Sequence, residues 1–342
     1  MALHYSGLGP PSYNRMVELY PAVEKTLRLS NIQSREKVVI YTDTKKNKDL
    51  VDCFFIALNN LGAEVALVMT TPQDDPDRDP LPIALKAMEN ADTIIDLASI
   101  GWIYTKPYSK LLDDGIRILC NMSDPDTCIK MMPIEETIKR AKNGGKLIDQ
   151  AKEIKVTSDC GTHLEVIKGD RPGMFQDSIL EGPGSWDNFP AAQCACAPLE
   201  DKANGKLVLN YGDVIATLKR RISEPVEITL EDGKIVNIQG GADALVLKNW
   251  FEKYNDPNAY VISHIGFGCD HRAEIETMEL MELESYGGNL MIAFGNNSGR
   301  FLGGKTVSKA HIDLILLNIS FYLDGEKIID KGEFYHPDLK DN

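Results

Sequence analysis

Short apolar runs alternate with amphipathic segments between residues 36 and 122, and this alternation limits the possible folds more than any other feature of the sequence. The runs are rich in β-branched residues and predict buried parallel strands, with Leu50–Leu61 as the clearest helix between them. Parallel strands require right-handed crossovers and helices on both faces of the sheet. Residues 1–150 are therefore predicted to form an α/β, Rossmann-like domain. The predicted strands are Lys37–Tyr41, Ala63–Val68, Asp92–Asp96 and Ile116–Leu119.

The turn after the first predicted strand lacks a glycine-rich phosphate-binding motif. Thr42-Asp-Thr-Lys-Lys-Asn-Lys48 stands where G-x-G-x-x-G or G-x-x-x-x-G-K-S/T would follow. Such glycines let the backbone approach a phosphate closely. We therefore expect no nucleotide cofactor.

The second half of the chain has a different sequence pattern, in which predicted strands alternate with Gly-rich turns. A helix predicted to open at Pro133–Thr137 and to be interrupted at Gly144-Gly145 leads into it, and a second helix is predicted near Asp243–Asn255. Glu231-Asp-Gly233 predicts a hairpin turn. Residues 151–342 are therefore predicted to form an α+β, β-rich domain. The predicted strands are Glu153–Ser158, Thr162–Lys168, Lys206–Tyr211, Val226–Leu230, Lys234–Ile238, Leu290–Phe294 and Ile312–Leu323.

The charge balance argues against two classes of partner. Acidic side chains outnumber basic ones by 51 to 37, and the formal net charge of −14 repels phosphate backbones and anionic membrane surfaces. The sequence has no basic and apolar leader at its start, and no stretch approaches the roughly 20 apolar residues that a bilayer span requires. We expect no nucleic acid partner, no membrane partner and a cytoplasmic location.

Two of the six histidines lie in a pattern that can hold a metal ion. In His311-Ile-Asp313 the two polar side chains are at i and i+2, so on a strand they point to one face. His264 lies in Ile262-Ser-His-Ile-Gly-Phe-Gly268, a predicted strand whose glycines allow close approach of backbone or ligand. Two imidazoles and one carboxylate are the ligand set of non-haem Fe(II) oxygenases. Spacing alone is more often that of an ordinary surface or hydrogen-bonded His-x-Asp pair.

Other candidate groups receive a structural interpretation. The seven cysteines include no Cys-x-x-Cys pair, so no zinc-thiolate or redox site is predicted. Cys269-Asp-His271 is interpreted as a polar loop. A group of glutamates with mostly helical spacing is expected to form a solvated face. These are Glu274, Glu276, Glu279, Glu282 and Glu284.

Several motif blocks carry a family resemblance. Between Tyr260 and Gly325 they are Ile262-Ser-His-Ile-Gly-Phe-Gly268, Gly303-Gly-Lys305, His311-Ile-Asp-Leu314 and Tyr322-Leu-Asp-Gly325. Upstream they are Pro183-Gly-Ser-Trp-Asp187, Gly205-Lys-Leu-Val-Leu209, Gly212-Asp213 and Ile238-Gln-Gly-Gly241. Together the blocks resemble the 2,5-dihydroxypyridine 5,6-dioxygenases, which are Fe(II) enzymes related to the aminopeptidase T metallopeptidases. The resemblance implies Fe(II) held by His264, His311 and Asp313, a small aromatic substrate with O2, and a homo-oligomer, with a hexamer as its expected form.

Departures from the peptidase pattern favour one ion over two. Gln193, in Pro190-Ala-Ala-Gln-Cys-Ala-Cys-Ala-Pro198, stands where the peptidases have a metal-binding Glu. Met291 stands where they have a His, and His264 takes the position of a second Glu. A neutral amide is a poor bridging ligand, and a thioether suits soft metals. The remaining set of two nitrogens and one oxygen suits a single ion better than a two-metal peptidase core.

Further departures concern the residues that the resemblance places around the substrate. Asn188 replaces a His that follows Trp-Asp in the dioxygenases, and Tyr104 with Thr105 replaces a His after the third N-terminal strand. Gln176 stands for a Glu, and Ala293 for a Ser near the metal. By analogy, Tyr104 is the candidate base, while Gln176 and Asn188 are the candidate groups that recognise the substrate.

The leading hypothesis is an Fe(II)-dependent, extradiol-like dioxygenase that opens a hydroxylated N-heteroaromatic ring. A deprotonated ring hydroxyl would raise electron density on the carbon that is attacked. The first alternative is a mononuclear metal-dependent amide or peptide hydrolase, in which the ion lowers the pKa of bound water. The second is a binding protein without catalytic activity.

Overall fold

The structure, a computed structural model, describes residues 13–76, 78–298 and 303–340. The chain folds into two compact units. The first runs to Pro133 and takes up Ser178–Pro190, and the second holds Ile134–Asp177 and continues from Ala191. The chain thus passes between the units three times, whereas the sequence predicted one division at residue 150. Among the described residues, no helix combines the length and the apolar character that a bilayer crossing needs.

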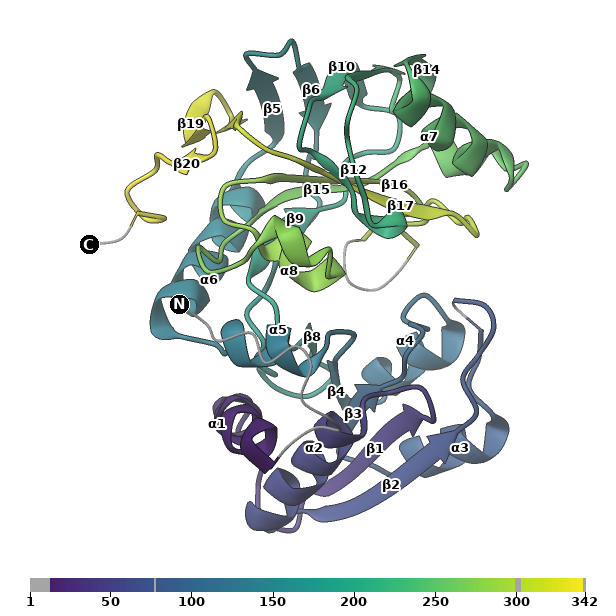
Figure 1. The fold of residues 1–342 in the computed structure, drawn as a ribbon, viewed down its shortest axis with the longest axis vertical. Helices are drawn as coiled ribbons and strands as arrows, with labels where there is room; N and C mark the ends of the chain where they lie inside the picture. The colour runs from purple at the N-terminus through teal and green to yellow at the C-terminus, as the bar shows by residue number, and fades with distance from the viewer. Residues whose placement is uncertain (1–12, 77, 299–302, 341–342) are drawn as a thin grey trace. The chain divides into compact units, whose positions relative to one another are not determined.

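A five-stranded parallel sheet organises the first unit, in the order β2-β1-β3-β4-β8 (Figure 1). All residues of β3 are buried, whereas the outer strand β2 is largely exposed. The predicted parallel sheet is therefore confirmed, and its Rossmann-like character stays a prediction. The elements of this unit are α1 (Tyr13–Leu29), β1 (Lys37–Asp43), α2 (Lys48–Asn60), β2 (Glu64–Thr70), α3 (Pro82–Met88), β3 (Thr93–Leu97), α4 (Lys106–Asp113), β4 (Arg117–Cys120), α5 (Pro125–Lys130) and β8 (Trp186–Asn188).

Local signals explain the α2 helix that links β1 to β2. The side-chain oxygen of Asn47 accepts hydrogen bonds from the backbone N–H groups of Asp49 and Leu50, at 2.9 and 3.3 Å, and so caps the first turn. Leu50, Phe54 and Leu58 recur every fourth residue and are fully buried. The apolar stripe therefore packs into the core of the unit.

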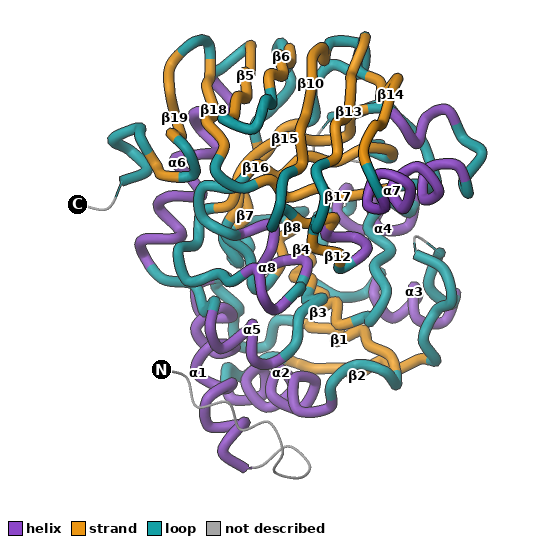
Figure 2. The backbone as a smooth tube through the Cα atoms, turned by 45° about the horizontal axis from the view of Figure 1, so that its top comes forward, coloured by secondary structure: helices purple, strands orange, loops and turns teal. Residues whose placement is uncertain are grey.

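Two antiparallel sheets build the second unit (Figure 2). One has eight strands in the order β14-β13-β10-β6-β5-β18-β19-β20, and the other has seven in the order β12-β11-β17-β16-β15-β9-β7. Buried side chains of both sheets share one hydrophobic core. The predicted β-rich second half is confirmed. The strands are β5 (Glu153–Ser158), β6 (His163–Ile167), β7 (Met174–Gln176), β9 (Gln193–Cys196), β10 (Ala203–Leu209), β11 (Val214–Ile215), β12 (Arg220–Arg221), β13 (Val226–Glu231), β14 (Lys234–Gly240), β15 (Ile262–Gly268), β16 (Leu290–Gly295), β17 (His311–Leu316), β18 (Ile319–Leu323), β19 (Glu326–Asp330) and β20 (Glu333–Phe334). The helices are α6 (Glu135–Gln150), α7 (Ala242–Glu252) and α8 (Leu280–Ser285), with 3-10 turns η1 (Ala216–Leu218), η2 (Pro257–Tyr260) and η3 (Ile275–Thr277).

Local differences from the prediction have steric causes. The α6 helix continues through Gly144-Gly145, where the sequence predicted an interruption. A Cβ at Gly144 would lie 2.6 Å from Sγ of Cys194 on β9, so a larger residue would not fit there. These glycines thus allow α6 to pack closely on the seven-stranded sheet. The run predicted as one strand from Ile312 to Leu323 is two strands, separated at Asn318, where φ is 55°. The hairpin predicted at Glu231-Asp-Gly233 joins β13 to β14 and is confirmed.

Candidate metal centre

Neighbouring strands of the seven-stranded sheet position the three predicted ligands. His311 and Asp313 lie on β17, and His264 lies on β15, with β16 between them. The β15–β16 register shifts between Ile262 and Ile265, so Ser263 and His264 both stand opposite the single residue Ala293. Such a bulge redirects a side chain. Ala293 also pairs with Asp313, and its short side chain leaves the space above β16 to the three ligands.

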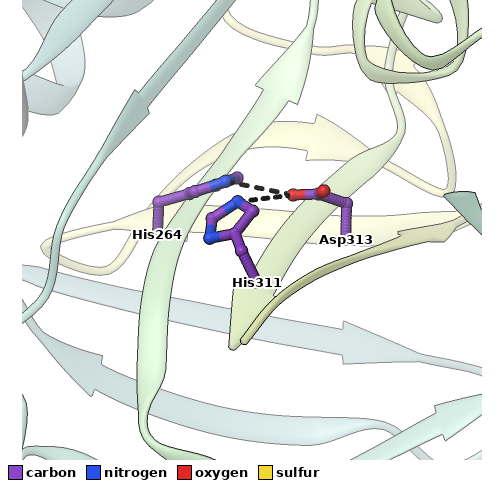
Figure 3. Close-up of side chains that lie close together, drawn as sticks. All are labelled: His264, His311 and Asp313. Carbon is purple, nitrogen blue, oxygen red and sulfur yellow. Dashed lines mark ion pairs between the residues drawn. The ribbon is translucent and has the colours of Figure 1, made fainter. Parts of the chain in front are cut away.

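The three side chains converge on one point (Figure 3). Oδ1 of Asp313 lies 3.2 Å from Nε2 of His264 and 3.2 Å from Nε2 of His311. Ligand atoms at about 2.1 Å from one ion and at right angles to each other are about 3 Å apart. Oδ1 of Asp313 is buried and makes no hydrogen bond to any described residue. The spacing, the donor set and this unmatched oxygen fit one divalent ion.

Two of the three ligands are held by further hydrogen bonds. Oγ1 of Thr217 donates to Oδ2 of Asp313 at 3.1 Å, so Oδ1 is turned toward the imidazoles. Nδ1 of His311 lies 2.9 Å from the carbonyl oxygen of Asn296. Because a carbonyl can only accept, Nδ1 of His311 carries a proton, and Nε2 is the nitrogen that could bind a metal ion after giving up its own proton. Nδ1 of His264 is buried, and the described part of the chain offers it no hydrogen-bond partner.

The electrostatics of this cluster are those of a cation site. Burial lowers the pKa of His264 below its usual value. Burial also lowers the pKa of His311, but the carboxylate of Asp313 outweighs it and raises this pKa to about 9. For Asp313, burial raises the pKa, yet the two imidazoles hold it far below its usual range. The site therefore keeps an ionised carboxylate beside an imidazole that attracts a positive charge.

A second polar group, formed by Gln176, Gln193 and Glu284, lies on the same face of the sheet. Gln176 on β7 pairs with Gln193 on β9, which pairs with Gly268 on β15. Directly paired residues share a face, and Gly268 shares the face of His264 because the two are four residues apart. Nε2 of Gln193 donates to Oε1 of Gln176 and, at 3.0 Å, to Oε2 of Glu284. The predicted recognition residue Gln176 is therefore buried in a hydrogen-bonded group within the unit that holds the metal cluster.

Glu284 was not predicted to be part of the site. The prediction that the glutamates form a solvated face is wrong for Glu284 and for Glu282. The exposed fraction is 8% for Glu284 and 0% for Glu282. Burial raises the pKa of Glu284 to about 8, and Asp313 adds to the effect. The cause of burial is tertiary: a Cβ at Gly268 would lie 2.5 Å from the carbonyl oxygen of Glu284, so the glycine lets the end of α8 lie directly on β15. The two glycines of β15, Gly266 and Gly268, were the feature of the sequence that could have indicated such a close contact.

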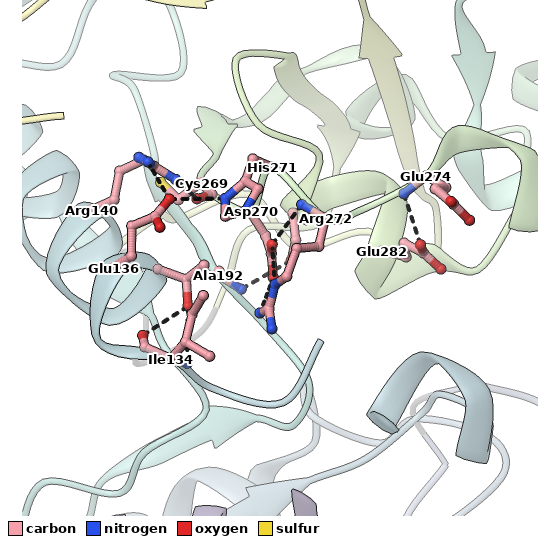
Figure 4. Close-up of polar contacts among 12 residues, drawn as sticks. Ile134, Glu136, Arg140, Ala192, Cys269, Asp270, His271, Arg272, Glu274 and Glu282 are labelled. Carbon is pink, nitrogen blue, oxygen red and sulfur yellow. Dashed lines mark hydrogen bonds and ion pairs between the residues drawn. The ribbon is translucent and has the colours of Figure 1, made fainter. Parts of the chain in front are cut away.

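The loop that follows β15 makes polar contacts with α6 and within itself (Figure 4). Nδ1 of His271 lies 2.9 Å from Oε1 of Glu136 on α6, and Asp270 pairs with Arg272. The buried carboxylate of Glu282 accepts hydrogen bonds from the backbone N–H of Glu274 and from Oγ1 of Thr277, both at 2.8 Å. These contacts fix the segment that carries α8.

The remaining predicted residues divide between the two units. Tyr104 precedes α4 in the first unit, and Asn188 is the last residue of β8, where it pairs with Cys120. Met291, in the second unit, packs in an apolar cluster with Leu283 and Ile315. Its surroundings are those of a core residue.

Comparisons with known proteins point to one family. A family model described as 2,5-dihydroxypyridine 5,6-dioxygenase matches residues 18–336. A 2,5-dihydroxypyridine 5,6-dioxygenase of Pseudomonas putida KT2440 is 31% identical over 263 residues, which cover 75% of this chain and 74% of that protein. A solved structure of the 2,5-dihydroxypyridine dioxygenase from Pseudomonas putida KT2440 has a TM-score of 0.88 and 26% identity, covering 97% of this chain and 100% of the other. Wild-type AmpT from Thermus thermophilus has a TM-score of 0.65 at 12% identity, covering 95% of this chain and 100% of the other, and shares the fold.

Proposed function

The chain belongs to the 2,5-dihydroxypyridine 5,6-dioxygenase family, and on this premise we propose that it is an Fe(II)-dependent dioxygenase that opens a hydroxylated N-heteroaromatic ring. The observation that carries the proposal is the convergence of two imidazoles and one carboxylate on one point. This ligand set leaves one face of an ion open. A compound like 2,5-dihydroxypyridine is the proposed substrate, together with O2.

His264, His311 and Asp313 would hold the ion through Nε2, Nε2 and Oδ1. Fe(II) bound there would supply a redox-active Lewis acid for O2 and for an oxygen of the substrate. Thr217 and Asn296 hold Asp313 and His311 in place by hydrogen bonds. These bonds reduce the reorganisation that ligation requires.

The family resemblance supports roles for three other residues. Tyr104 is the proposed acceptor of the ring hydroxyl proton, and loss of that proton raises electron density on the ring carbon that reacts. Gln176 and Asn188 are proposed to orient the ring by hydrogen bonds. In the net reaction one ring C–C bond breaks and both atoms of O2 are added, so the product has the mass of the substrate plus one O2.

Metal analysis with an oxygen assay tests the proposal. The protein is purified anaerobically, its metal is quantified, and 2,5-dihydroxypyridine and related ring compounds are added under O2. We expect about one iron per chain, loss of the ring absorbance, and one O2 consumed per ring. Zinc or cobalt with cleavage of an amide would favour the hydrolase instead. A protein that takes up no metal would favour the binding protein.

A further inference from the structure

His264 reaches the metal cluster only because β15 contains one extra residue. The register of β15 on β16 shifts by one residue between Ile262 and Ile265. If the register of Ile262 continued, His264 would stand opposite Ile292, and directly paired residues share a face. Ile292 is fully buried in the hydrophobic core of the unit. The extra residue, Ser263, therefore turns the imidazole from the core to the face that carries the other two ligands.

Two hydrogen bonds hold Ser263 to the segment that follows β16. Its Oγ donates to the carbonyl oxygen of Asn296 at 2.7 Å, and its own carbonyl oxygen accepts from Nδ2 of Asn297 at 3.3 Å. The three residues are 0%, 5% and 1% exposed, so bulk water is excluded from these bonds. A bulge leaves its extra residue unpaired in the ladder. The two asparagines supply hydrogen bonds to the residue that the ladder leaves out.

The carbonyl oxygen of Asn296 also holds the second imidazole. It accepts a hydrogen bond of 2.9 Å from Nδ1 of His311, besides the one from Oγ of Ser263. A carbonyl oxygen has two lone pairs, and both are used here. One atom thus joins the bulge that aims His264 to the ring of His311, and the two ring centroids are 5.3 Å apart (Figure 3).

The amide of Asn297 fits its surroundings in one orientation only. Oδ1 accepts from the backbone N–H of Thr306 at 2.7 Å, while Nδ2 donates to the carbonyl of Ser263. Both partners are backbone groups with fixed roles, so a flipped amide would set two donors and two acceptors against each other. A Cβ at Gly304 would lie 2.2 Å from Cγ of Asn297. The glycine motif Gly303-Gly-Lys305 therefore makes room for this side chain.

We propose that Ser263 is a positioning residue for the metal ligand His264, and that Ser263, Asn296 and Asn297 form a clip that sets the position of one imidazole relative to the other. The clip touches neither the ion nor the substrate, and it acts through the bulge and through one shared carbonyl. This deepens the proposed function, on whose metal site it rests.

Metal titration of Ser263→Ala tests the proposal. The metal-free protein is titrated with Co(II) under argon, and the visible spectrum is recorded at saturation. We expect the affinity to fall about 10- to 100-fold, because the bulge loses the bond that holds it in place. The absorption bands of bound Co(II) should also shift, since they report the arrangement of the ligands. Unchanged affinity and an unchanged spectrum would overturn the proposal.

Ser320→Ala is the matched control in the same titration. Ser320 is also a buried serine with two hydrogen bonds, to Asp330 at 3.2 Å and from the backbone N–H of Lys331 at 3.1 Å, but it lies in the other sheet. Its variant should keep both the affinity and the spectrum of the unmodified protein. Thermal unfolding of the metal-free proteins verifies that each variant is folded. An equal loss of affinity in both variants would show that the effect of Ser263 is not specific to the clip.

Asn297→Asp gives an independent test, in which positioning and charge act in opposite directions. The aspartate has the shape of the asparagine, but it sets an oxygen against the carbonyl of Ser263 and adds a negative charge to the unit that holds the cation site. Charge alone would tighten the binding of Co(II). The clip instead predicts binding about 10-fold weaker, because the bulge loses its second hydrogen bond. Tighter binding would refute the role of Asn297.

Failure of the clip is distinguishable from failure of the proposed function, because the titrations need no turnover. If the unmodified protein binds no Co(II), both are overturned. If it binds one equivalent and both clip variants match it, the clip alone fails. If the variants lose affinity as expected, while the iron-loaded unmodified protein opens no hydroxypyridine ring under O2, the clip stands and the proposed function fails.

Discussion

Thr217 and Asp313 exchange two hydrogen bonds. Oγ1 of Thr217 donates to Oδ2 of Asp313 at 3.1 Å, and it accepts from the backbone N–H of Asp313 at 2.9 Å. Oδ2 of Asp313 is thereby held by Thr217, a residue of η1, and Oδ1 points toward the two imidazoles. The orientation of the Asp313 carboxylate therefore depends on Thr217, which is not itself a predicted metal ligand.

Thr217→Val should weaken metal binding by about 10- to 100-fold, since the valine keeps the shape and loses the hydroxyl that orients the carboxylate. Anaerobic titration with Fe(II) or Co(II) measures the change. Thr217→Ser retains the hydroxyl and should bind almost as tightly as the unmodified protein. Equal affinity in the valine variant would show that Asp313 needs no such support.

His264→Ala, His311→Ala and Asp313→Ala should each lose the bound ion and remain folded. Each removes a donor from a three-ligand site, and no described side chain nearby replaces it. Elemental analysis gives the metal content, and circular dichroism checks the fold. Stoichiometric metal in any two of these variants would contradict the ligand assignment.

The site should saturate at one ion per chain. Met291 lies in an apolar cluster, and Gln193 offers a neutral amide that is already hydrogen-bonded. Two dications near one carboxylate would repel strongly in a buried site. Titration of the metal-free protein with Co(II) under argon should therefore end at one equivalent.

The double variant Gln193→Glu with Met291→His should gain at most a second, weaker equivalent, because the apolar surroundings remain. The unmodified protein is the matched control in the same titration. Two tight equivalents in the unmodified protein, with release of amino acids from peptides, would favour the aminopeptidase alternative.

Asp243→Asn should lower stability at neutral pH by about 1–2 kcal/mol. Burial raises the pKa of Asp243, but hydrogen bonds from Ser223, Arg220 and Glu224 lower it from 3.8 to about 2. Because the folded-state pKa is depressed, this stabilisation is present above about pH 4 and is lost as the pH falls toward 2. Urea unfolding of both proteins from pH 7 to pH 3 measures it. The difference between them should shrink in acid, and a constant difference would contradict the linkage.

Light scattering should give a mass several times 38.0 kDa, with a hexamer as the expected form. The resemblance implies assembly, and the outer strand β2 exposes 44% of Leu67 and 52% of Met69. Exposed apolar groups of this kind are typical of surfaces that are covered in an oligomer. A clean monomer at micromolar concentration would contradict this prediction.

The sequence predicted those parts of the fold whose signals are local. The buried runs at β1 and β3 were found because their residues are apolar on both faces, and β13 with β14 because of alternation and a turn at Asp232-Gly233. The short strands β8 and β11 were missed, since two or three residues show no period. Pairing with distant strands makes them part of a sheet.

The candidate site shows the same division. His311 and Asp313 were predicted to share a face because they are two residues apart, and the structure confirms that placement. The structure also brings His264 to them, which the resemblance had suggested. Glu284 was misjudged, because helical spacing says nothing about which side of a six-residue helix meets β15. The contact between α8 and β15 depends on Gly268 and on the tertiary packing of the chain, which local spacing in the sequence does not show.

Gly268 and His264 lie on one strand, β15, and each positions a different part of the second unit. The missing side chain of Gly268 admits the backbone from Glu284 to Tyr286, while His264, four residues upstream, faces Asp313. The segment between β15 and β16 and the cluster of His264, His311 and Asp313 are therefore both positioned by this strand. Any larger residue at Gly268 would displace the segment from Glu284 to Tyr286, because a Cβ there would lie 2.3–2.5 Å from its backbone atoms. A chain that keeps this packing of α8 on β15 should therefore keep a glycine at position 268.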